Sequence, residues 1–357
     1  MRKSLIITGL DIGSSKVSSV AGEITPDGTF KIIAQVTSPS RGVSRGAVED
    51  LNEATDVVSK TIARLRDKIR RRPDNIYVNI NGTTIKGERA KGMIPLSLRG
   101  REITRPDMER CVNVASTINL PLEREIIHKI PQAFSIDDQP PVKNPLGLSA
   151  SRLTCEVYVI TANINHIQNI YKCVAGSGYD VREAVFTGIA AGAAILGADD
   201  KREGGVMLLD MGNSVTGVSI FLNGSLNDLD IIPLGAKDVK GDPKESAEFN
   251  GILARIDSTA RRSSDRGVKI NSVTLTGGMT FTDSVVEALE AKLPYPVRMG
   301  AVRSVRGEIS SVESIRAATA IGLARYGCEK IKRRAIEGKN LINRLSNKVV
   351  DIFNNYF

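Results

Sequence analysis

Two short segments of the sequence place an aspartate, a glycine and small polar side chains directly after an apolar run. They are Leu10-Asp11-Ile12-Gly13-Ser14-Ser15 and Leu209-Asp210-Met211-Gly212-Asn213-Ser214. Glycine lets the backbone approach a phosphate closely, successive amide groups point at its oxygens, and an aspartate can hold Mg²⁺ or its water ligands. The pattern therefore indicates two phosphate-binding turns that grip one nucleotide from opposite sides.

The residues expected to contact the phosphates come from both turns. They are Asp11, Gly13, Ser14, Ser15 and Lys16 on one side, and Asp210, Gly212, Asn213 and Ser214 on the other. Asp11 and Asp210 are the predicted metal ligands, and they would position metal and water in any hydrolysis by electrostatics rather than by covalent catalysis. The alternative is that the glycines only form tight turns, with the aspartates as hydrogen-bond acceptors of those turns.

A third glycine pair, Gly277-Gly278, follows a buried-strand pattern and precedes a helical pattern through Val285 and Leu289. A strand, two glycines and a helix suit a ribose or base that lies over a helix N-terminus. Gly277 and Gly278 are therefore predicted to lie near the ribose and base. The alternative is that these glycines only allow close packing.

The elements around the two turns follow the same order. Each turn lies between two strand patterns, and a hairpin turn then leads to a third strand. The hairpin turns are Asp27-Gly28 and Asn223-Gly224, and an amphipathic helix is predicted to begin at Asp50 in the first unit. The repeat predicts a duplicated α/β domain with a cleft between its halves.

Two segments depart from the repeat. Residues 82–160 contain short strand patterns and a helix opened by Thr104, followed by five prolines at positions 121, 131, 140, 141 and 145, which indicates a small inserted subdomain. Between Pro233 and Val273 there is room for a turn and one helix over residues 248–262, but not for a further sheet-bearing subdomain.

The charge and cysteine content argue against several classes of protein. The net charge of +9 is concentrated in residues 64–72 and 328–357, so a surface coated in positive charge for nucleic acid is disfavoured. The four cysteines are far apart and only two histidines are present, which disfavours a disulfide framework or a zinc site and favours a reducing cytosol. Residues 5–10 are too short for a signal peptide, and residues 185–198 are too short to span a bilayer.

Residues 341–357 have the clearest helical periodicity in the chain. At 100° per residue, seven large apolar side chains share one arc of about 120°. They are Leu341, Ile342, Leu345, Val349, Ile352, Phe353 and Tyr356, and Phe357 adds a further aromatic ring at the end. With the basic cluster of residues 330–334 beside it, this amphipathic helix suits the surface of an anionic membrane. The alternative is a terminal helix packed on the core of its own domain.

Together these motifs resemble the FtsA family of bacterial cell-division proteins within the actin-like ATPase superfamily, over nearly the whole chain. The first turn, residues 10–17, is similar to the family's first phosphate motif. The most specific matches lie in the predicted insert, at residues 101–104, 120–128, 131–134 and 144–148. Residues 275–278 and 318–327 are similar to later family motifs.

The resemblance implies an α/β fold of two duplicated ribonuclease-H-type domains, with a small inserted α+β subdomain and a C-terminal amphipathic helix. The expected division of the chain is a first domain of residues 1–81 and 161–198, an insert of residues 82–160, a second domain of residues 199–327 with a truncated fourth subdomain, and a basic linker with a membrane-targeting helix over residues 328–357.

The function implied by the resemblance is that of a peripheral protein on the cytoplasmic face of the cell membrane, at the division septum. Such a protein binds ATP with Mg²⁺, self-associates into filaments through the insert and links the tubulin homologue FtsZ to the membrane, without nucleic acid. In the family, the fourth subdomain forms a wall of the adenosine pocket and carries the docking surface for FtsZ. Its truncation in this chain therefore affects both adenine affinity and FtsZ binding.

The second turn departs from the family pattern Asp-x-Gly-Gly-Gly-Thr, because Asn213 and Ser214 stand where the family has glycines. This predicts that ATP is bound and that its hydrolysis is slow or absent. One alternative is a scaffold that has lost nucleotide binding. Another is a sugar or acetate kinase of the same superfold, but residues 186–189 offer no carboxylate base for it.

Overall fold

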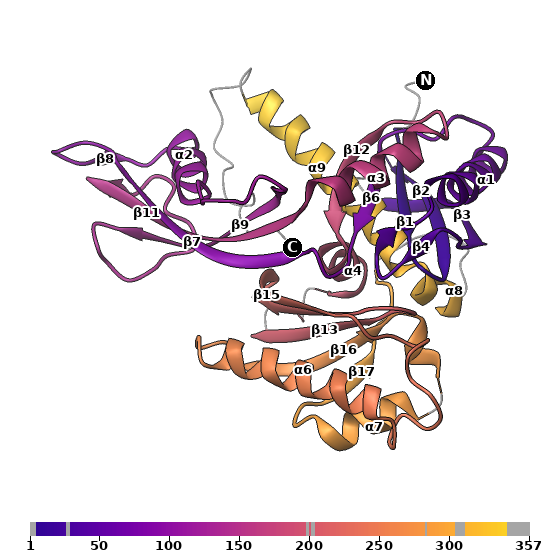
Figure 1. Ribbon diagram of the computed structural model, residues 1–357. Helices are drawn as coiled ribbons and strands as arrows, with labels where there is room; N and C mark the ends of the chain where they lie inside the picture. The colour runs from indigo at the N-terminus through magenta and orange to yellow at the C-terminus, as the bar shows by residue number, and fades with distance from the viewer. Residues whose placement is uncertain are drawn as a thin grey trace.

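Two five-stranded mixed sheets form the centres of two domains, and a third, three-stranded sheet projects from the first domain (Figure 1). The structure is a computed structural model that describes residues 5–25, 29–197, 200, 204–282, 284–303 and 311–340. The predicted turn Asp27-Gly28 and the amphipathic helix of residues 341–357 therefore lie outside the described residues. No helix among the described residues is long and apolar enough to cross a membrane.

The two central sheets have the same strand order. The first sheet is β12-β6-β1-β2-β3, formed by β1 (Ile6–Ile12), β2 (Lys16–Ile24), β3 (Phe30–Pro39), β6 (Ile76–Ile80) and β12 (Val181–Phe186). The second sheet is β17-β16-β13-β14-β15, formed by β13 (Gly205–Met211), β14 (Thr216–Leu222), β15 (Ser225–Ile232), β16 (Ile270–Thr276) and β17 (Val297–Met299). In chain order, the first three strands of each sheet pair as antiparallel neighbours. The fourth and fifth strands of each sheet run parallel to its first strand. The predicted duplication is confirmed by this shared topology.

Equivalent helices connect the strands of the two sheets. They are α1 (Leu51–Ile69) and α6 (Ala247–Ser264) before the fourth strand, and α3 (Ile164–Ala175) and α7 (Val285–Lys292) before the fifth. As expected, the side chain of Asp50 caps α1 by accepting a hydrogen bond from the N–H of Glu53, while Arg70 ends the helix in the left-handed conformation. Helix α6 is the one helix in the short segment after β15, as the sequence predicts.

Two further helices join the domains by crossing between them. Helix α4 (Thr187–Ile195) follows the first sheet but also contacts β13 and β14, and α9 (Ala318–Asn340) follows the second sheet but packs on β1, β2 and β6. The two helices touch so closely that a Cβ at Gly322 would collide with the Ala190 carbonyl. Helix α9 runs without a break through residues 328–340, which the sequence assigned to a linker, and Cys328 is fully buried.

The insert is an α+β unit with its own core. Its sheet, in the order β7-β11-β9, consists of β7 (Lys86–Pro95), β9 (Arg124–Ile136) and β11 (Arg152–Asn163). Helix α2 (Arg105–Ala115) packs on β7 and β11, and a short pair, β8 (Arg101–Glu102) with β10 (Ser149–Ala150), lies at the far end (Figure 1). The expected cap is present, since Thr104 and Asp107 form a capping box.

Candidate functional site

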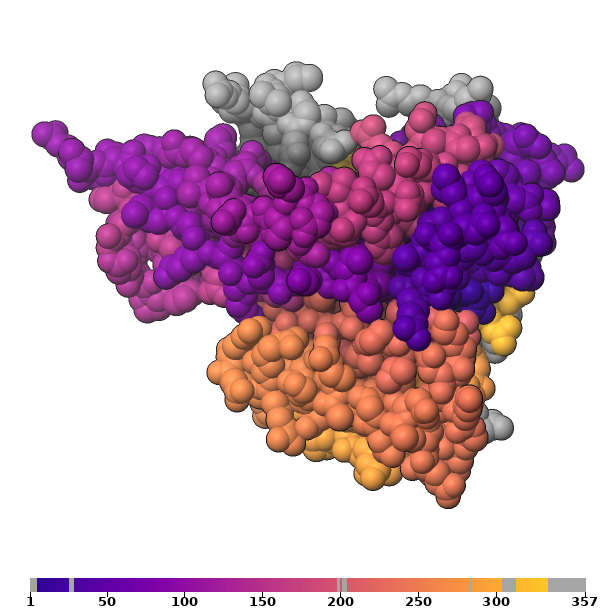
Figure 2. Space-filling view, in the orientation of Figure 1, coloured from indigo at the N-terminus to yellow at the C-terminus, as the bar shows by residue number. Residues whose placement is uncertain are grey.

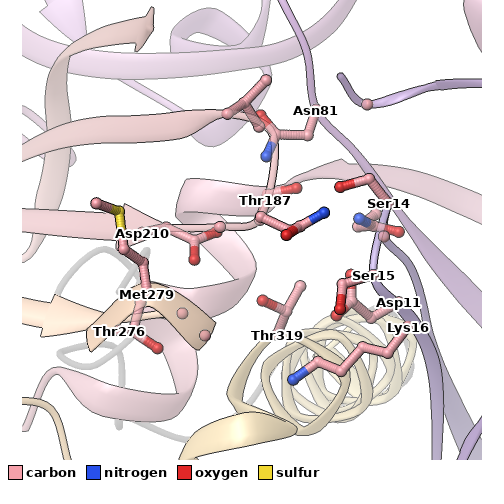
Figure 3. A pocket seen from close by; sticks show the side chains of 18 of the residues that line it. Asp11, Ser14, Ser15, Lys16, Asn81, Thr187, Asp210, Thr276, Met279 and Thr319 are labelled. Atoms are coloured by element: carbon pink, nitrogen blue, oxygen red, sulfur yellow. The ribbon is translucent and has the colours of Figure 1, made fainter. Parts of the chain in front are cut away.

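The two duplicated turns face one cavity between the domains, with a volume of about 430 Å³ (Figure 3). This volume is typical of small-molecule sites. Ten of the predicted residues line the cavity: Asp11, Gly13, Ser14, Ser15, Lys16, Asp210, Gly212, Asn213, Gly277 and Gly278. The structure thus brings together side chains that lie about 200 positions apart in the sequence. Their contact with a nucleotide stays a prediction.

The two turns have the same backbone geometry. In the first, the N–H of Gly13 donates to the carbonyl of Lys16 at 3.0 Å, and in the second the N–H of Gly212 donates to the carbonyl of Val215 at 3.0 Å. Each turn therefore closes a tight hairpin and holds an aspartate at the end of the preceding strand. The matched geometry accounts for the sequence repeat whether or not a ligand is bound.

Burial in the cleft disfavours the charged forms of both aspartates. It raises the pKa of Asp11 to about 7, with Lys16 acting against the shift and Asp210 adding to it. It raises the pKa of Asp210 to about 6, again opposed by Lys16. A bound cation would offset the cost of two facing carboxylates.

A divalent cation at these aspartates would need further ligands from outside the chain. The described residues contain no group of three or more histidine, cysteine, aspartate or glutamate side chains placed to hold a metal. Mg²⁺ is commonly held by one or two carboxylates together with substrate phosphates and waters. The pair Asp11 and Asp210 fits that arrangement and does not fit an all-protein metal cage.

Lys16 is less free than the sequence suggested. Its ammonium group donates to the carbonyl oxygen of Arg316, the last residue of α8 (Ser311–Arg316). Burial lowers the pKa of Lys16, while Asp11 and Asp210 act in the opposite direction. The charge predicted to meet the β- and γ-phosphates therefore also links the first turn to the helix pair α8–α9.

Ser214 does not line the cavity, although the sequence placed it among the phosphate ligands. Its fully buried hydroxyl accepts a hydrogen bond from the N–H of Arg45 at 3.0 Å and donates to Ser14 Oγ at 2.7 Å. Arg45 lies in the hairpin of β4 (Val43–Ser44) and β5 (Ala47–Val48). Ser214 therefore joins the two turns directly. The sequence did not predict this, because the pattern of residue types does not tell which way a side chain points.

The second turn is also covered by its own domain. The N–H of Lys237 donates to the carbonyl of Asn213 at 2.9 Å, and a Cβ at Gly235 would lie 2.6 Å from the backbone of Asn213 and Ser214. Asn213 does not have a positive φ, so this position does not require a glycine's backbone conformation. The second turn is thus the more enclosed of the two.

The two glycines after β16 have different roles. Gly277 has φ of 94°, and a Cβ there would lie 2.8 Å from Oδ1 of Asp210, so close packing requires this glycine. Gly278 faces open space, with no atom within 4 Å of an added Cβ. Gly278 begins a 3₁₀ turn, η1 (Gly278–Phe281), and the helix predicted through Val285 and Leu289 follows as α7.

Several polar residues of the cavity were missed in the sequence. They are Asn79, Asn81, Thr187, Thr276 and Thr319. Asn79 has the clearest role, because its Oδ1 accepts the N–H of Ile12 at 2.7 Å and so fixes the end of β1. Most of these residues lie at the ends of parallel strands, where side chains converge, and that rule could have identified them. Of the described lining residues, only Asp11 and Asp210 are acidic.

Comparisons with known proteins agree with the insert and the fold. A family model described as "SHS2 domain inserted in FTSA" matches residues 82–161. The cell division protein FtsA of Pseudomonas aeruginosa is 28% identical over 91% of this chain and 90% of its own. FtsA of Borreliella burgdorferi is 28% identical over 98% of this chain and 95% of its own, and FtsA of Escherichia coli is 32% identical over 66% of this chain and 56% of its own.

A solved structure supports the fold alone. A chain of the PilM–PilN type IV pilus biogenesis complex superposes with a TM-score of 0.64 at 16% identity, over 90% of this chain and 98% of that one.

The alignment with the Borreliella protein spans 402 positions but uses only 98% of these 357 residues, or about 350 of them. Some 50 aligned positions therefore have no residue here, in line with a shortened chain.

Proposed function

Since the chain belongs to the FtsA family as a divergent member with a shortened fourth subdomain, we propose that it binds ATP with Mg²⁺ between its two domains and links division proteins to the cytoplasmic face of the membrane. Family membership and the actin-like fold support a role in cell division. The nucleotide, the filaments, the membrane contact and the FtsZ-type partner are the proposed parts.

One observation carries the proposal of nucleotide binding. Two copies of the same aspartate-bearing turn face a single cavity of about 430 Å³, one from each domain. Asp11 and Asp210 would hold the cation, and the first turn, with Ser14, Ser15 and Lys16, would hold phosphate oxygens. The bound cation would neutralise phosphate charge, which is its usual contribution in phosphoryl-transfer sites.

Hydrolysis is proposed to be slow or absent. Asp11 and Asp210 are the acidic groups among the described lining residues, and in this proposal both are assigned to the cation. Thr187, whose hydroxyl donates to the carbonyl of Ile80, stands where the connecting segment enters the cavity. An alkyl hydroxyl is a poor general base near neutral pH, so neither ATP hydrolysis nor a sugar-kinase reaction is favoured.

A titration with ATP and Mg²⁺ tests nucleotide binding. We expect saturable binding by the full chain and an affinity lower by roughly tenfold or more in Asp11→Ala and Asp210→Ala. Asp257→Ala is the matched control, because Asp257 pairs with Arg261 on the surface of α6. Equal affinity in the parent, the control and both cleft variants would refute the assigned site.

The membrane contact is proposed to come from residues 341–357, and self-association from the insert. The insert carries exposed large apolar side chains that a partner surface would cover, namely Met93, Leu98, Val114, Leu122 and Leu148. Sedimentation with vesicles of anionic phospholipid should pellet the full chain and leave a chain ending at residue 340 in solution. Equal pelleting of the two proteins would remove the tail from the proposal.

A nucleotide-independent scaffold is the second candidate, and the direct link between the turns favours it. Ser14 and Ser214 are bonded across the cleft, and Arg45 lies 3.9 Å from Asp238 of the second domain. The two domains are therefore held together by protein contacts alone. In this case the titration would show no saturable ATP binding, while vesicle sedimentation would still depend on residues 341–357.

A further inference from the structure

The insert is covalently part of the first domain, yet one end of it rests on the second domain. Strands β7, β9 and β11 all contact β15, the edge strand of the second sheet. Figure 1 shows the insert passing above β15, and Figure 2 shows the insert in contact with the second domain. A sheet edge that would otherwise expose unpaired backbone groups is thus covered by another part of the same chain.

The centre of this contact is a buried polar group from each side. Tyr158 on β11 is 1% exposed and Asp228 on β15 is 3% exposed. The tyrosine hydroxyl donates to Asp228 Oδ1 at 3.3 Å and accepts the N–H of Leu229 at 3.0 Å. Behind it, Arg262 of α6 donates from Nε to Asp228 Oδ2 at 2.8 Å, so the carboxylate is held from both domains.

A second set of hydrogen bonds lies beside the first. Arg89 on β7 donates to Asn227 Oδ1 at 2.5 Å, and Asn227 Nδ2 donates to Gln132 Oε1 at 2.7 Å. Gln132 on β9 in turn donates to the carbonyl of Leu226 at 3.0 Å. The three strands of the insert together therefore bond to four consecutive residues of β15, from Leu226 to Leu229, and Asn227 is only 5% exposed.

The insert is shaped for this contact. A Cβ at Gly87 would collide with the hydroxyl oxygen of Tyr158, so the neighbouring strand must carry glycine for the ring to reach β15. The charges are also matched, because Arg89 is balanced by Glu156 of the insert and Arg262 by Asp228. A chance contact between two mobile units would not require either feature.

None of the residues that form this contact lines the cavity. The domains touch through the crossing of α4 and α9, through Ser14 and Ser214 at the cavity, and through the insert at β15. Rotation of one domain relative to the other about the helix crossing would break the insert contact and expose Tyr158, Asn227 and Asp228. Buried polar groups that lose their partners are costly, which makes such a rotation unfavourable.

We propose that the insert braces the second domain, and that the bonds of Arg89, Gln132 and Tyr158 to β15 fix the angle between the two domains. The brace acts without nucleotide, so this inference does not depend on the proposed function. The insert then serves two purposes, since its far end is free for a partner while its near end sets the width of the cleft.

The test measures the distance between the domains in the full chain without nucleotide. Spin labels are placed at Asn52→Cys on α1 and Asn250→Cys on α6, two exposed positions, and the four native cysteines are buried and poorly reactive. The parent should give one narrow distance distribution by double electron–electron resonance. Removing the tyrosine hydroxyl with Tyr158→Phe should broaden it and add a second population at a shifted distance.

Tyr171→Phe is the matched control, because that hydroxyl bonds the Ala184 backbone inside the first domain, and it should leave the distribution unchanged. Gln132→Ala should act in the same direction as Tyr158→Phe, and it decides the question on the same criterion if the tyrosine variant does not fold. A distribution as narrow as the parent's in the folded brace variants would overturn the proposal.

Discussion

The two phosphate-type turns share a backbone but differ in what surrounds them. The first turn presents Ser14, Ser15 and Lys16 along the cavity. The second has Val215 in place of the lysine and Ser214 turned away into a bond with Ser14. The duplication thus preserves the hairpin and the aspartate. In the second copy, the backbone of the turn and the hydroxyl of Ser214 are hydrogen-bonded to neighbouring segments.

This difference indicates a division of roles between the turns. The first turn keeps the groups that could meet a phosphate, and the second is covered by the segment of residues 235–237. A covered turn is more rigid than an exposed one, whereas a turn that binds a ligand must keep its polar groups accessible. Stability should therefore depend more on the second turn, and ligand binding should depend more on the first.

The largest expected effect on stability comes from the cover of the second turn. Gly235→Ala would place a Cβ 2.6 Å from the backbone of Asn213 and Ser214, so we expect a loss of about 3 kcal/mol in the free energy of unfolding. Denaturant unfolding followed by circular dichroism measures it. Gly278→Ala is the control, since no atom lies within 4 Å of its added Cβ. Equal losses in both variants would contradict the enclosure of the second turn.

A second prediction concerns the pH dependence of stability. Asp11 and Asp210 have folded pKa values of about 7 and about 6, above the ordinary value of 3.8. Between these limits the folded protein keeps protons that the unfolded chain has released. The stabilisation is therefore complete below pH 3.8 and is lost as the pH rises through about 6 and then about 7.

Asp11→Asn removes the buried charge and should raise the free energy of unfolding at pH 8 by about 2 kcal/mol, with a smaller gain for Asp210→Asn. The gain should shrink as the pH falls toward 5, where the parent carboxyls are protonated. Thermal unfolding without Mg²⁺ across this pH range checks the prediction. A gain that does not vary with pH would show that the aspartates do not titrate as described.

The smallest effect is expected from the bond between the turns. Ser214→Ala leaves the N–H of Arg45 without its acceptor and Ser14 without its donor, which should cost about 1–2 kcal/mol in the free energy of unfolding. Ser15→Ala, on the open side of the first turn, should change stability by less than about 0.5 kcal/mol. A larger loss for Ser15→Ala than for Ser214→Ala would reverse the comparison.

Local sequence patterns were enough to predict much of the fold and the cavity. The alternation of apolar residues placed the strands, Asp50 indicated the start of α1, and Asn223-Gly224 forms the expected hairpin turn with both residues at positive φ. The two aspartates meet because a duplicated hairpin is built at the same place in each sheet. These features depend on residues close together in sequence or on the repeat itself.

The features that were not predicted depend on tertiary contacts. The orientation of Ser214 is set by Ser14 and Arg45, which lie at least 169 positions away. Helix α9 continues past the buried Cys328 to Asn340, where the sequence predicted a basic linker. The contact of Tyr158 with β15 has no local signal either, because a tyrosine in a strand pattern is compatible with any core.

Helix α9 connects two distant points of the molecule as a single stiff rod. Its first turn carries Thr319 at the wall of the cavity, and its 23 residues end at Asn340. At 1.5 Å per residue the rod is about 35 Å long. The segment that begins at residue 341 is therefore joined covalently to a helix whose first turn forms part of the cavity wall.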